Sequence, residues 1–478
     1  MIQMLMKNIL TTAIAIALQL FFHLNSTAQE KVQISVEEAI EQLNSNSRTI
    51  EIAQKGIEIA EGEKAKLNST WYPYIGAAGT YINMSEKIEV SETLGDLAQP
   101  VVEMIPQLEQ ILSLLGSSTL SFPLLDNNVA TIDGTIAWPL FTGGKRIYAN
   151  KIGKSLVNTA TLRKEIIQNT QFTLLIERYY TVKLLKHTID VCKEETQANR
   201  LLYDNATKLM ENGIINHAEM LVAKVAYEEA TLKLESTVRK YSVAEKSLFA
   251  MLEIDTLSTN INAELTTPFF ICSAIPDLNH FITLAHENNQ QTKIIEQQKN
   301  MATNSKKIAK SGYMPDISIF ARQNIYSYNI PSNLLPRRMV GAAFAWNIFD
   351  GLNREKRIET ARLQEESLEL GKREAETEIT RNIRELYSLM EDSKESVKTI
   401  RTSISLTEEL VEIRKKSFNE GMATTQEVVD ANSLLAKSNL AYTLACYQYE
   451  IALANMLALC GNTMEFIRYS QMDGNIFK

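Results

Sequence analysis

The sequence predicts a mainly α-helical protein with a membrane β-barrel, built from two copies of one repeat. Three observations favour this fold class. The 478 residues include only 18 glycines and 10 prolines, about half the usual share of these two residues, so long uninterrupted helices are expected. Two stretches of the chain match each other at a fixed offset, which indicates a duplication. Four short segments alternate apolar residues with small or polar ones, as strands with one apolar face do.

The duplication rests on two pairs of landmarks. Residues 138–143 align with residues 346–351 at an offset of 208, and Asn212-Gly213 aligns with Glu420-Gly421 at the same offset. Each repeat is therefore expected to contain a helix, a strand pair, a very long helix, a glycine turn and a return helix. The predicted boundaries are 29–253 for the first repeat, 254–275 for a linker, 276–461 for the second repeat and 462–478 for a C-terminal tail.

Helical periodicity places three helices in each repeat, because apolar residues recur at steps of three and four. The expected helices span about 36–68, 145–210 and 217–252 in the first repeat, and 278–311, 354–418 and 425–459 in the second. At 1.5 Å per residue the long helix would extend about 100 Å. Each hairpin of long helix and return helix is therefore expected to be a rod.

The alternating segments are expected as strands at about 73–83, 131–141, 315–327 and 339–349, with a long loop at 84–130. Their period of two and their aromatic ends fit a membrane barrel. The candidate membrane-interface aromatics are Tyr81, Trp138, Tyr326 and Trp346. The alternative is a small soluble sheet that packs on helices. Four strands cannot close a barrel, and open sheet edges are not tolerated in hydrocarbon, so two, three or four copies would have to share one barrel.

The N-terminus has the features of a secretory signal peptide at residues 1–28. A lysine precedes an apolar run over residues 9–22, and Ser26 and Ala28 are small residues at the positions that precede a cleavage site. An N-terminal membrane anchor is the alternative, but the apolar run is short for a membrane span. The mature protein is therefore expected to be exported.

Composition and motifs disfavour several function classes. A net charge of −8 without a basic stretch argues against a nucleic-acid binder. The four cysteines lack the spacing of a zinc site or a disulfide scaffold. The segment 143–146 lacks the distal glycine and the hydroxyl residue of a phosphate loop, and no GxSxG motif occurs. No enzyme is predicted, and neither catalytic, cofactor-binding nor metal-binding residues are proposed.

The repeated order of elements behind a signal peptide resembles the TolC-like outer membrane efflux protein family, the outer membrane factors of tripartite efflux and type I secretion systems. The most specific marks are the Trp-Pro-Leu-Phe-Thr-Gly-Gly stretch at 138–144 and the glycine turns at 213 and 421. The resemblance implies a homotrimer in the outer membrane of a Gram-negative bacterium. Its 12-stranded β-barrel, with four strands per chain, would continue as an α-helical barrel in the periplasm.

The resemblance also implies an exit duct that docks to a periplasmic adaptor (membrane fusion) protein and to an inner-membrane RND- or ABC-type transporter. The competing class is a periplasmic helical-hairpin adaptor or a structural scaffold protein. That class would explain the long hairpins, but it leaves the duplication and the strands without an explanation.

The resemblance places acidic residues at the periplasmic entrance of the duct, where this sequence has Glu219, Glu427 and Asp430. Glu427 and Asp430 are three residues apart and so share one helix face, and several copies would form a ring that favours cations. For the two glutamates the alternative is that acids near a helix start offset its dipole. The adaptor-docking tips implied by the resemblance are Met210, Asn212, Gly213, Ile214, Phe418, Asn419, Glu420, Gly421 and Met422. The two glycines are also expected to be helix C-caps.

Overall fold

The computed structural model describes residues 33–93, 119–254, 264–272, 274–331 and 336–472. The expected signal peptide (1–28) lies outside these residues. The chain divides into two compact units. The helical unit contains the described residues up to 57, those of 160–295 and those from 371 onwards, and the strand unit contains those of 58–159 and 296–370.

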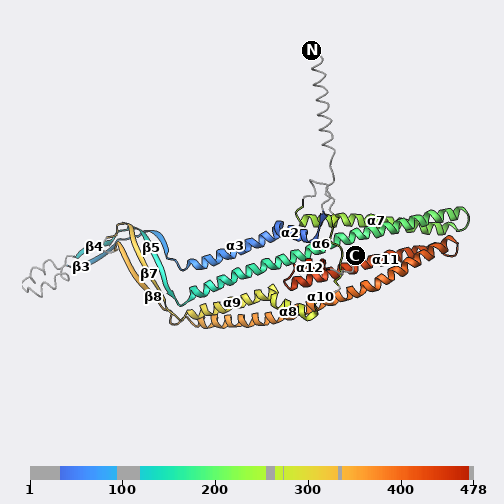
Figure 1. Ribbon diagram of the computed structural model, residues 1–478. Coiled ribbons are helices and arrows are strands. Elements are labelled where there is room, and N and C mark those ends of the chain that lie inside the picture. The colour runs from blue at the N-terminus through green and yellow to red at the C-terminus, as the bar shows by residue number, and fades with distance from the viewer. Residues whose placement is uncertain (1–32, 94–118, 255–263, 273, 332–335, 473–478) are drawn as a thin grey trace, which may run out of the picture. The chain divides into compact units, whose positions relative to one another are not determined.

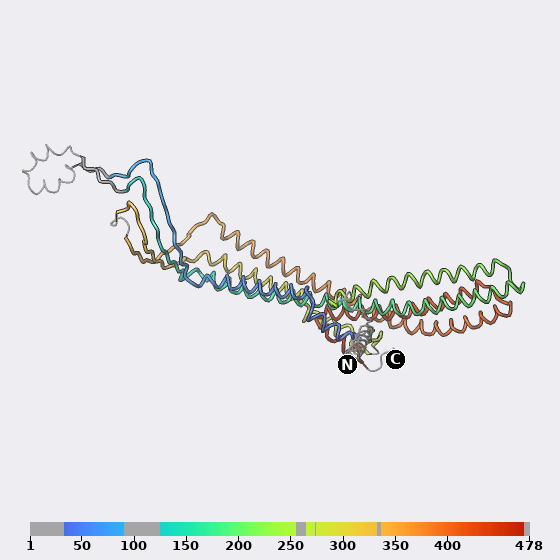
Figure 2. The backbone as a smooth tube through the Cα atoms, turned by 90° about the horizontal axis from the view of Figure 1, so that it is seen from above, coloured from blue at the N-terminus to red at the C-terminus, as the bar shows by residue number. Residues whose placement is uncertain are grey.

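Each repeat contains one long helical hairpin, labelled in Figure 1. Helices α6 (Lys145–Glu211) and α10 (Asn353–Asn419) both have 67 residues, and the return helices α7 (His217–Met251) and α11 (Thr425–Leu459) both have 35. Among the described residues, no helix combines the length and the apolar character that a membrane crossing requires. Within the helical unit the two hairpins run side by side (Figure 2), with α7 in contact with α11. The hairpins confirm the predicted duplication, because α6 and α10 begin 208 residues apart, and so do α7 and α11.

The first helix of each repeat is broken, so the prediction of single helices at 36–68 and 278–311 is wrong. The first repeat has α2 (Val36–Asn46) and α3 (Arg48–Ser69), and the second has α8 (Leu278–Asn288) and α9 (Gln290–Ser311). The intervening residues, Ser47 and Asn289, have ψ of 113° and 125°, which end a helix. Asn289 also starts the next helix, because its Oδ1 accepts the backbone N–H groups of Gln291 and Thr292 at 2.9 and 3.3 Å.

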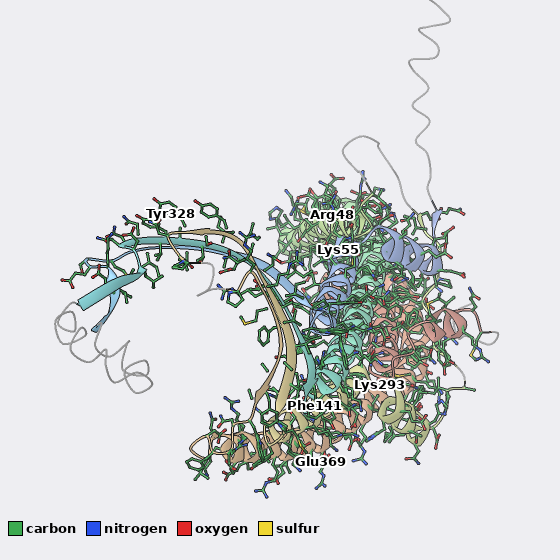
Figure 3. All side chains as sticks on the ribbon, turned by 90° about the vertical axis from the view of Figure 1, so that its left-hand side faces the viewer. Arg48, Lys55, Phe141, Lys293, Tyr328 and Glu369 are labelled. Carbon is green, nitrogen blue, oxygen red and sulfur yellow. The ribbon has the colours of Figure 1, made fainter. Side chains whose placement is uncertain are left out.

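The strand unit contains a four-stranded antiparallel sheet in the order β2–β5–β7–β8. The strands are β2 (Tyr74–Asn83), β5 (Asn128–Thr142), β7 (Asp316–Tyr328) and β8 (Arg338–Ala345). Pairing of β5 with β7 joins the strand pairs of the two repeats. The sheet is strongly curved (Figure 3), with Phe141 and Tyr328 at its opposite ends. Four strands per chain are thus confirmed, and the outer edges of β2 and β8 have no strand partner among the described residues.

The two faces of the sheet differ in polarity, as the alternation predicts. Cross-strand pairing places one set of exposed apolar side chains on the same face, namely Ile136, Trp138, Ile317, Ile319, Val340 and Phe344. The opposite face carries Asp133, whose carboxylate accepts from Arg322 Nη2 at 2.5 Å and from Asn324 Nδ2 at 3.0 Å. The sheet therefore has one apolar face that no described part of this chain covers and one polar face.

The predicted loop at 84–130 contains two further strands, β3 (Ile88–Thr93) and β4 (Thr119–Leu125), which pair antiparallel. Residues 94–118 of this loop lie outside the described residues. Strand β3 was not predicted, because its alternation covers only six residues, too few to distinguish from a polar loop.

The core of the helical unit includes residues from the predicted linker (254–275) and the predicted C-terminal tail (462–478). In the 254–275 segment, β6 (Glu264–Leu265) pairs with the N-terminal strand β1 (Gln33–Ile34), and Phe270 is 1% exposed. In the 462–478 segment, helix α12 (Glu465–Ser470) buries Phe466 completely. The Phe466 ring lies 5.8 Å from that of Phe172 on α6 and 5.5 Å from that of Phe270, between ring centroids. Both segments therefore complete the core.

Candidate functional site

The two hairpins turn through the same backbone structure. Gly213 and Gly421 have φ of 72° and 73°, a left-handed conformation that costs other L-residues energy. The N–H of Ile214 donates to the Leu209 carbonyl at 2.9 Å, and the N–H of Met422 donates to the Ser417 carbonyl at 2.8 Å. Each long helix therefore ends in a Schellman motif, as the predicted glycine C-caps require.

Replacing Gly421 by alanine is expected to lower the free energy of unfolding by about 1 kcal/mol, because the alanine Cβ is strained at this φ. The matched control is Gly371→Ala in the middle of α10, where an added Cβ has no atom within 4 Å. That change should raise the free energy of unfolding by about 0.5–1 kcal/mol. Chemical denaturation of both variants measures the difference, and equal effects would contradict the assignment of the strain to the turn.

Each return helix begins with a side-chain cap. The Asn216 side chain accepts from Glu219 N at the start of α7, and the Thr424 side chain accepts from Glu427 N at the start of α11. Glu427 completes a capping box, because its Oε2 accepts the Thr424 N–H at 3.2 Å. The same carboxylate lies 3.3 Å from Arg414 Nη1 on α10. Glu427 therefore stabilises the start of α11, as the alternative interpretation of this acid expects.

Glu219 joins the two hairpins instead of capping its own helix. Its Oε2 accepts the backbone N–H of Thr425 at 3.0 Å, and Thr425 is the first residue of α11. The N–H groups of a first helical turn lack partners within their own helix, and they attract anions. A carboxylate from the first repeat therefore satisfies the helix start of the second repeat.

Asp430 differs from the two glutamates. It lies one turn deeper in α11 and is exposed, and its Oδ1 accepts Gln426 Nε2 at 2.8 Å. Among the described residues it has no ion-pair partner. Of the three predicted acids, Asp430 therefore has the charge that is least compensated by the other groups of the same chain.

The predicted tip residues divide into exposed and buried groups. Ile214 and Met422 are 59% and 72% exposed, and the exposed residues at the turns also include Asn212, Gly213, Asn419, Glu420 and Gly421. Met210 is partly buried. Phe418 is 3% exposed and packs in a cluster with Leu202, Met220 and Val428. The assignment of Phe418 to a docking surface is therefore wrong, because its side chain holds the hairpins together.

A buried pair of asparagines links the hairpins and was missed from the sequence. Asn432 Nδ2 on α11 donates to Asn199 Oδ1 on α6 at 3.2 Å, and the two residues are 5% and 4% exposed. Asn199 Nδ2 in turn donates to the Ala226 carbonyl on α7 at 3.4 Å. A polar pair in an apolar seam fixes the register between helices. The sequence could have indicated this pair, because an asparagine occupies an apolar position in each helix.

The four predicted interface aromatics lie toward the two ends of the sheet. Trp138 and Trp346 lie at the end nearest the helices, and their Nε1 atoms donate to the carbonyls of Trp71 and Tyr313 at 3.0 and 3.1 Å. Tyr81 and Tyr326 lie toward the opposite end and are 67% and 51% exposed. Tyr326 pairs with Ile132 across the sheet. An apolar band flanked by aromatic residues is typical of strands that cross an outer membrane.

Two buried arginines fix the junctions between strands and helices, and they too were missed. We call them the arginine clamps. Arg146 donates to the Leu140 carbonyl at 2.8 Å, with its guanidinium carbon 4.3 Å from the ring centroid of Trp71. Arg354 occupies the equivalent place in the second repeat, 4.5 Å from the ring centroid of Tyr313. The 208-residue offset that aligns the glycine turns also aligns these arginines, so the sequence contained the signal.

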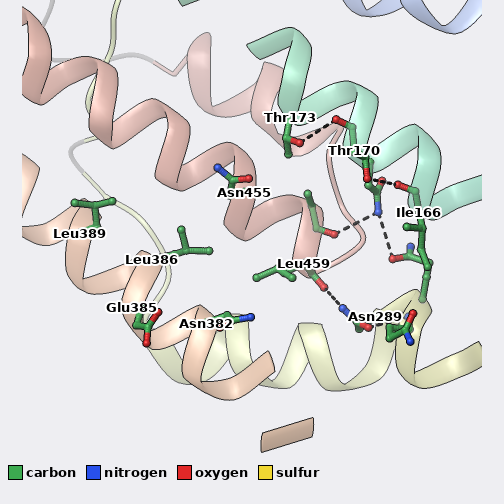
Figure 4. A pocket seen from close by; sticks show the side chains of 14 residues that line it. Ile166, Thr170, Thr173, Asn289, Asn382, Glu385, Leu386, Leu389, Asn455 and Leu459 are labelled. Carbon is green, nitrogen blue, oxygen red and sulfur yellow. Dashed lines mark hydrogen bonds between the residues drawn. The ribbon is translucent and has the colours of Figure 1, made fainter. Parts of the chain in front are cut away.

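A cavity of about 630 Å³ lies where α6, α10 and α11 meet the break between α8 and α9 (Figure 4). Carboxamide side chains line much of it. Asn169 Nδ2 donates to Gln290 Oε1 and to the Ala458 carbonyl, both at 3.3 Å, and Asn289 Nδ2 donates to the Leu459 carbonyl at 3.0 Å. These bonds join the helices around the cavity. Across the described part of the chain, no group of three or more His, Cys, Asp or Glu side chains is placed to bind a metal.

Comparison with known proteins identifies relatives of this fold. Residues 281–462 match the outer membrane efflux protein family, and no curated protein matches the sequence. The outer membrane protein VceC of Vibrio cholerae is 14% identical, with a TM-score of 0.69 over 90% of this chain and 96% of that one. The CmeC outer membrane channel of Campylobacter jejuni is 11% identical, with a TM-score of 0.68 over 91% and 89%. The open state of the MtrE outer membrane channel of Neisseria gonorrhoeae is 11% identical, with a TM-score of 0.66 over 90% and 89%. At these identities the likeness to the solved channels shows a common fold.

Proposed function

We propose that the protein is an outer-membrane exit duct of the outer membrane efflux protein family, whose model matches residues 281–462. It passively conducts substrates that an inner-membrane pump and a periplasmic adaptor deliver to it. It resides in the outer membrane of a Gram-negative bacterium and extends into the periplasm. The observation that carries this proposal is the family match, which includes β7, β8 and the whole second hairpin.

The sheet supports a barrel shared between copies. Its apolar face has exposed side chains such as Val340 (82%) and Phe344 (65%), and its edges β2 and β8 are unpaired among the described residues. Hydrocarbon accepts the apolar face but not an open edge. Pairing of β8 of one copy with β2 of the next satisfies both edges, and three copies give a closed barrel of twelve strands.

The hairpins support contact between copies as well. Exposed apolar residues follow one face of α7, namely Leu221, Val225, Leu232 and Val243, and α10 exposes Leu406 and Ile413. Repeated exposed apolar side chains along a helix favour packing against another helix. In the homotrimer these faces meet and close the helical barrel. The exposed turn residues then contact the adaptor, and Glu219, Glu427 and Asp430 surround the entrance.

Two adjacent substitutions in β8 test the proposal. Val340 and Met339 lie on opposite faces of the strand, since Val340 pairs with Ala321 and Met339 pairs with Arg322. Lysine at a lipid-facing position costs about 2–4 kcal/mol, whereas lysine inside a water-filled barrel costs little. The amount of trimer that detergent extracts from outer membranes should therefore fall strongly in Val340→Lys. In Met339→Lys it should stay near the wild-type amount. The extracted wild-type trimer should conduct ions across a planar bilayer.

The competing adaptor or scaffold predicts different results. A protein without lipid-facing strands would be released without detergent, and the two lysine variants would behave alike. A conducting species with the mass of one chain would also contradict the shared barrel.

A further inference from the structure

Among the residues that the structure describes, the core of the helical unit encloses one carboxyl group. Glu450 on α11 is 0% exposed, and the other buried residues of this helix are apolar or neutral. Its Oε1 accepts the backbone N–H of Phe270 at 2.6 Å, and its Oε2 has no hydrogen-bond partner among the described residues. A buried carboxylate without a cation close by is costly, whereas a neutral acid in the same place is tolerated.

Glu450 contacts the segment that joins the two repeats, residues 264–272, which we call the repeat linker. From the side of α6, Lys183 Nζ donates to the Leu265 carbonyl at 3.3 Å and also to the Thr267 carbonyl. Tyr179 Oη accepts the Thr267 N–H at 3.1 Å. The repeat linker is thus bound by α6 near its start and by Glu450 of α11 near its end.

Several titratable groups interact electrostatically with Glu450. They are Tyr179, Tyr180 and Lys183 of α6, Cys272 of the repeat linker and Cys446 of α11. Within the described structure no ion pair joins Lys183 to Glu450, because the ammonium is directed to backbone carbonyls. Burial raises the pKa of Glu450 well above its usual value of 4.5, and the Phe270 hydrogen bond and the charge of Lys183 offset this only in part.

We propose that Glu450 is a proton-dependent latch: as a neutral acid it holds the repeat linker on α11, and its ionisation releases the linker. The carboxylate needs water, and water reaches this position only when Phe270 and its neighbours move away from α11. This regulatory role is independent of the proposed duct, because it depends only on the core of the helical unit.

The sign of the pH dependence follows from the direction of the shift. A carboxyl whose pKa is raised in the folded protein contributes stability that is complete below about pH 4.5 and is lost as pH rises through the folded pKa. Burial lowers the pKa of Lys183, so its titration has the opposite sign. The thiols and phenols have usual pKa values of 9.0 and 10.0 that burial raises further. Of these groups, only Glu450 loses stability as pH rises above 4.5 towards neutral pH.

Hydrogen exchange of the full-length protein in detergent, read by mass spectrometry between about pH 5 and 8, tests the latch. After correction for intrinsic rates, protection of the amides of the repeat linker should fall as pH rises in the wild type, by up to about tenfold per pH unit, which is the limit for one titrating proton. Glu450→Gln retains an acceptor for Phe270 N–H and removes the titration, so its protection should not change with pH. Glu391→Gln, which neutralises an exposed acid of α10, should behave as the wild type.

A second variant distinguishes the latch from a buried ion pair. Lys183→Met should keep the pH dependence, because Glu450 is already neutral beside Lys183. If the two residues instead form an ion pair in the folded protein, wild-type protection should not fall between about pH 5 and 8, and Lys183→Met should introduce the pH dependence. Protection that stays constant in the wild type, or that falls equally in Glu450→Gln, would also overturn the proposal. Constant protection in the wild type would overturn the proposal even if a variant does not fold.

Discussion

Replacing Arg354 by methionine is expected to lower the free energy of unfolding by about 3–5 kcal/mol. Arg354 is 7% exposed, and it donates to the carbonyls of Gly312 and Asn347, both at 2.9 Å, and of Ile348 at 2.7 Å. Its Nε lies 3.4 Å from Asp350 Oδ2. Methionine fills the space but leaves three carbonyls without their donor and one carboxylate without its cation. Chemical denaturation in detergent, followed by circular dichroism, measures the loss.

Arg357→Met is the matched control, because Arg357 is exposed one turn further along α10. Its effect should be within about 0.5 kcal/mol of zero. The first-repeat clamp offers a graded comparison, since Arg146 makes two carbonyl hydrogen bonds and no described ion pair. Arg146→Met should therefore cost less than Arg354→Met. Equal losses in Arg354→Met and Arg357→Met would contradict the role of the clamp.

Neutralising the acids of α11 together, as Asp430→Asn with Glu427→Gln, is expected to reduce the cation-over-anion selectivity of the duct about tenfold. Asp430 contributes most, because no described cation compensates its charge, whereas Glu427 is paired with Arg414. Glutamine can keep the capping box at Thr424, so the helix start should remain intact. Reversal potentials across a planar bilayer with a salt gradient measure the change.

Glu420→Gln provides the control for this experiment. Glu420 is an exposed acid at the turn, where the charge lies outside the proposed ring. If Glu420→Gln reduces selectivity as much as the double variant does, the charge of the whole tip and not a ring at 427 and 430 sets the selectivity. Unchanged selectivity in the double variant would remove both residues from the entrance.

Much of the fold could be predicted because it is repeated. A single turn glycine is weak evidence, but Gly213 and Gly421 at the same offset as the Trp138 and Trp346 segments fixed the lengths of both hairpins. The breaks at Ser47 and Asn289 were not predictable from periodicity, since the apolar spacing continues through them. At Asn289 the cause is local hydrogen bonding, because the asparagine side chain competes with the helix for the backbone N–H groups of Gln291 and Thr292.

The candidate site was predicted less completely. Position along the helix located Glu219, Glu427 and Asp430, but it could not show that Glu219 reaches the start of a helix some 200 residues later. Phe418 was predicted at the docking tip because a residue at a helix end is expected to be exposed. The neighbouring hairpin, which buries it, is not evident from the sequence. Burial of Glu450 could have been predicted, because it is a single acid in the apolar second half of α11.

The core of the helical unit joins parts of the chain that are made at very different times. Ile34, Phe270 and Phe466 all belong to it, so its first and last contributions are separated by more than 400 residues of synthesis. Contacts this remote in sequence form late. A polypeptide that has crossed the inner membrane as far as α11 still exposes Phe172 and Phe270, which makes it prone to aggregation and proteolysis. Translocation of α12 must therefore precede closure of this core, and a frameshift near residue 460 is expected to eliminate the protein.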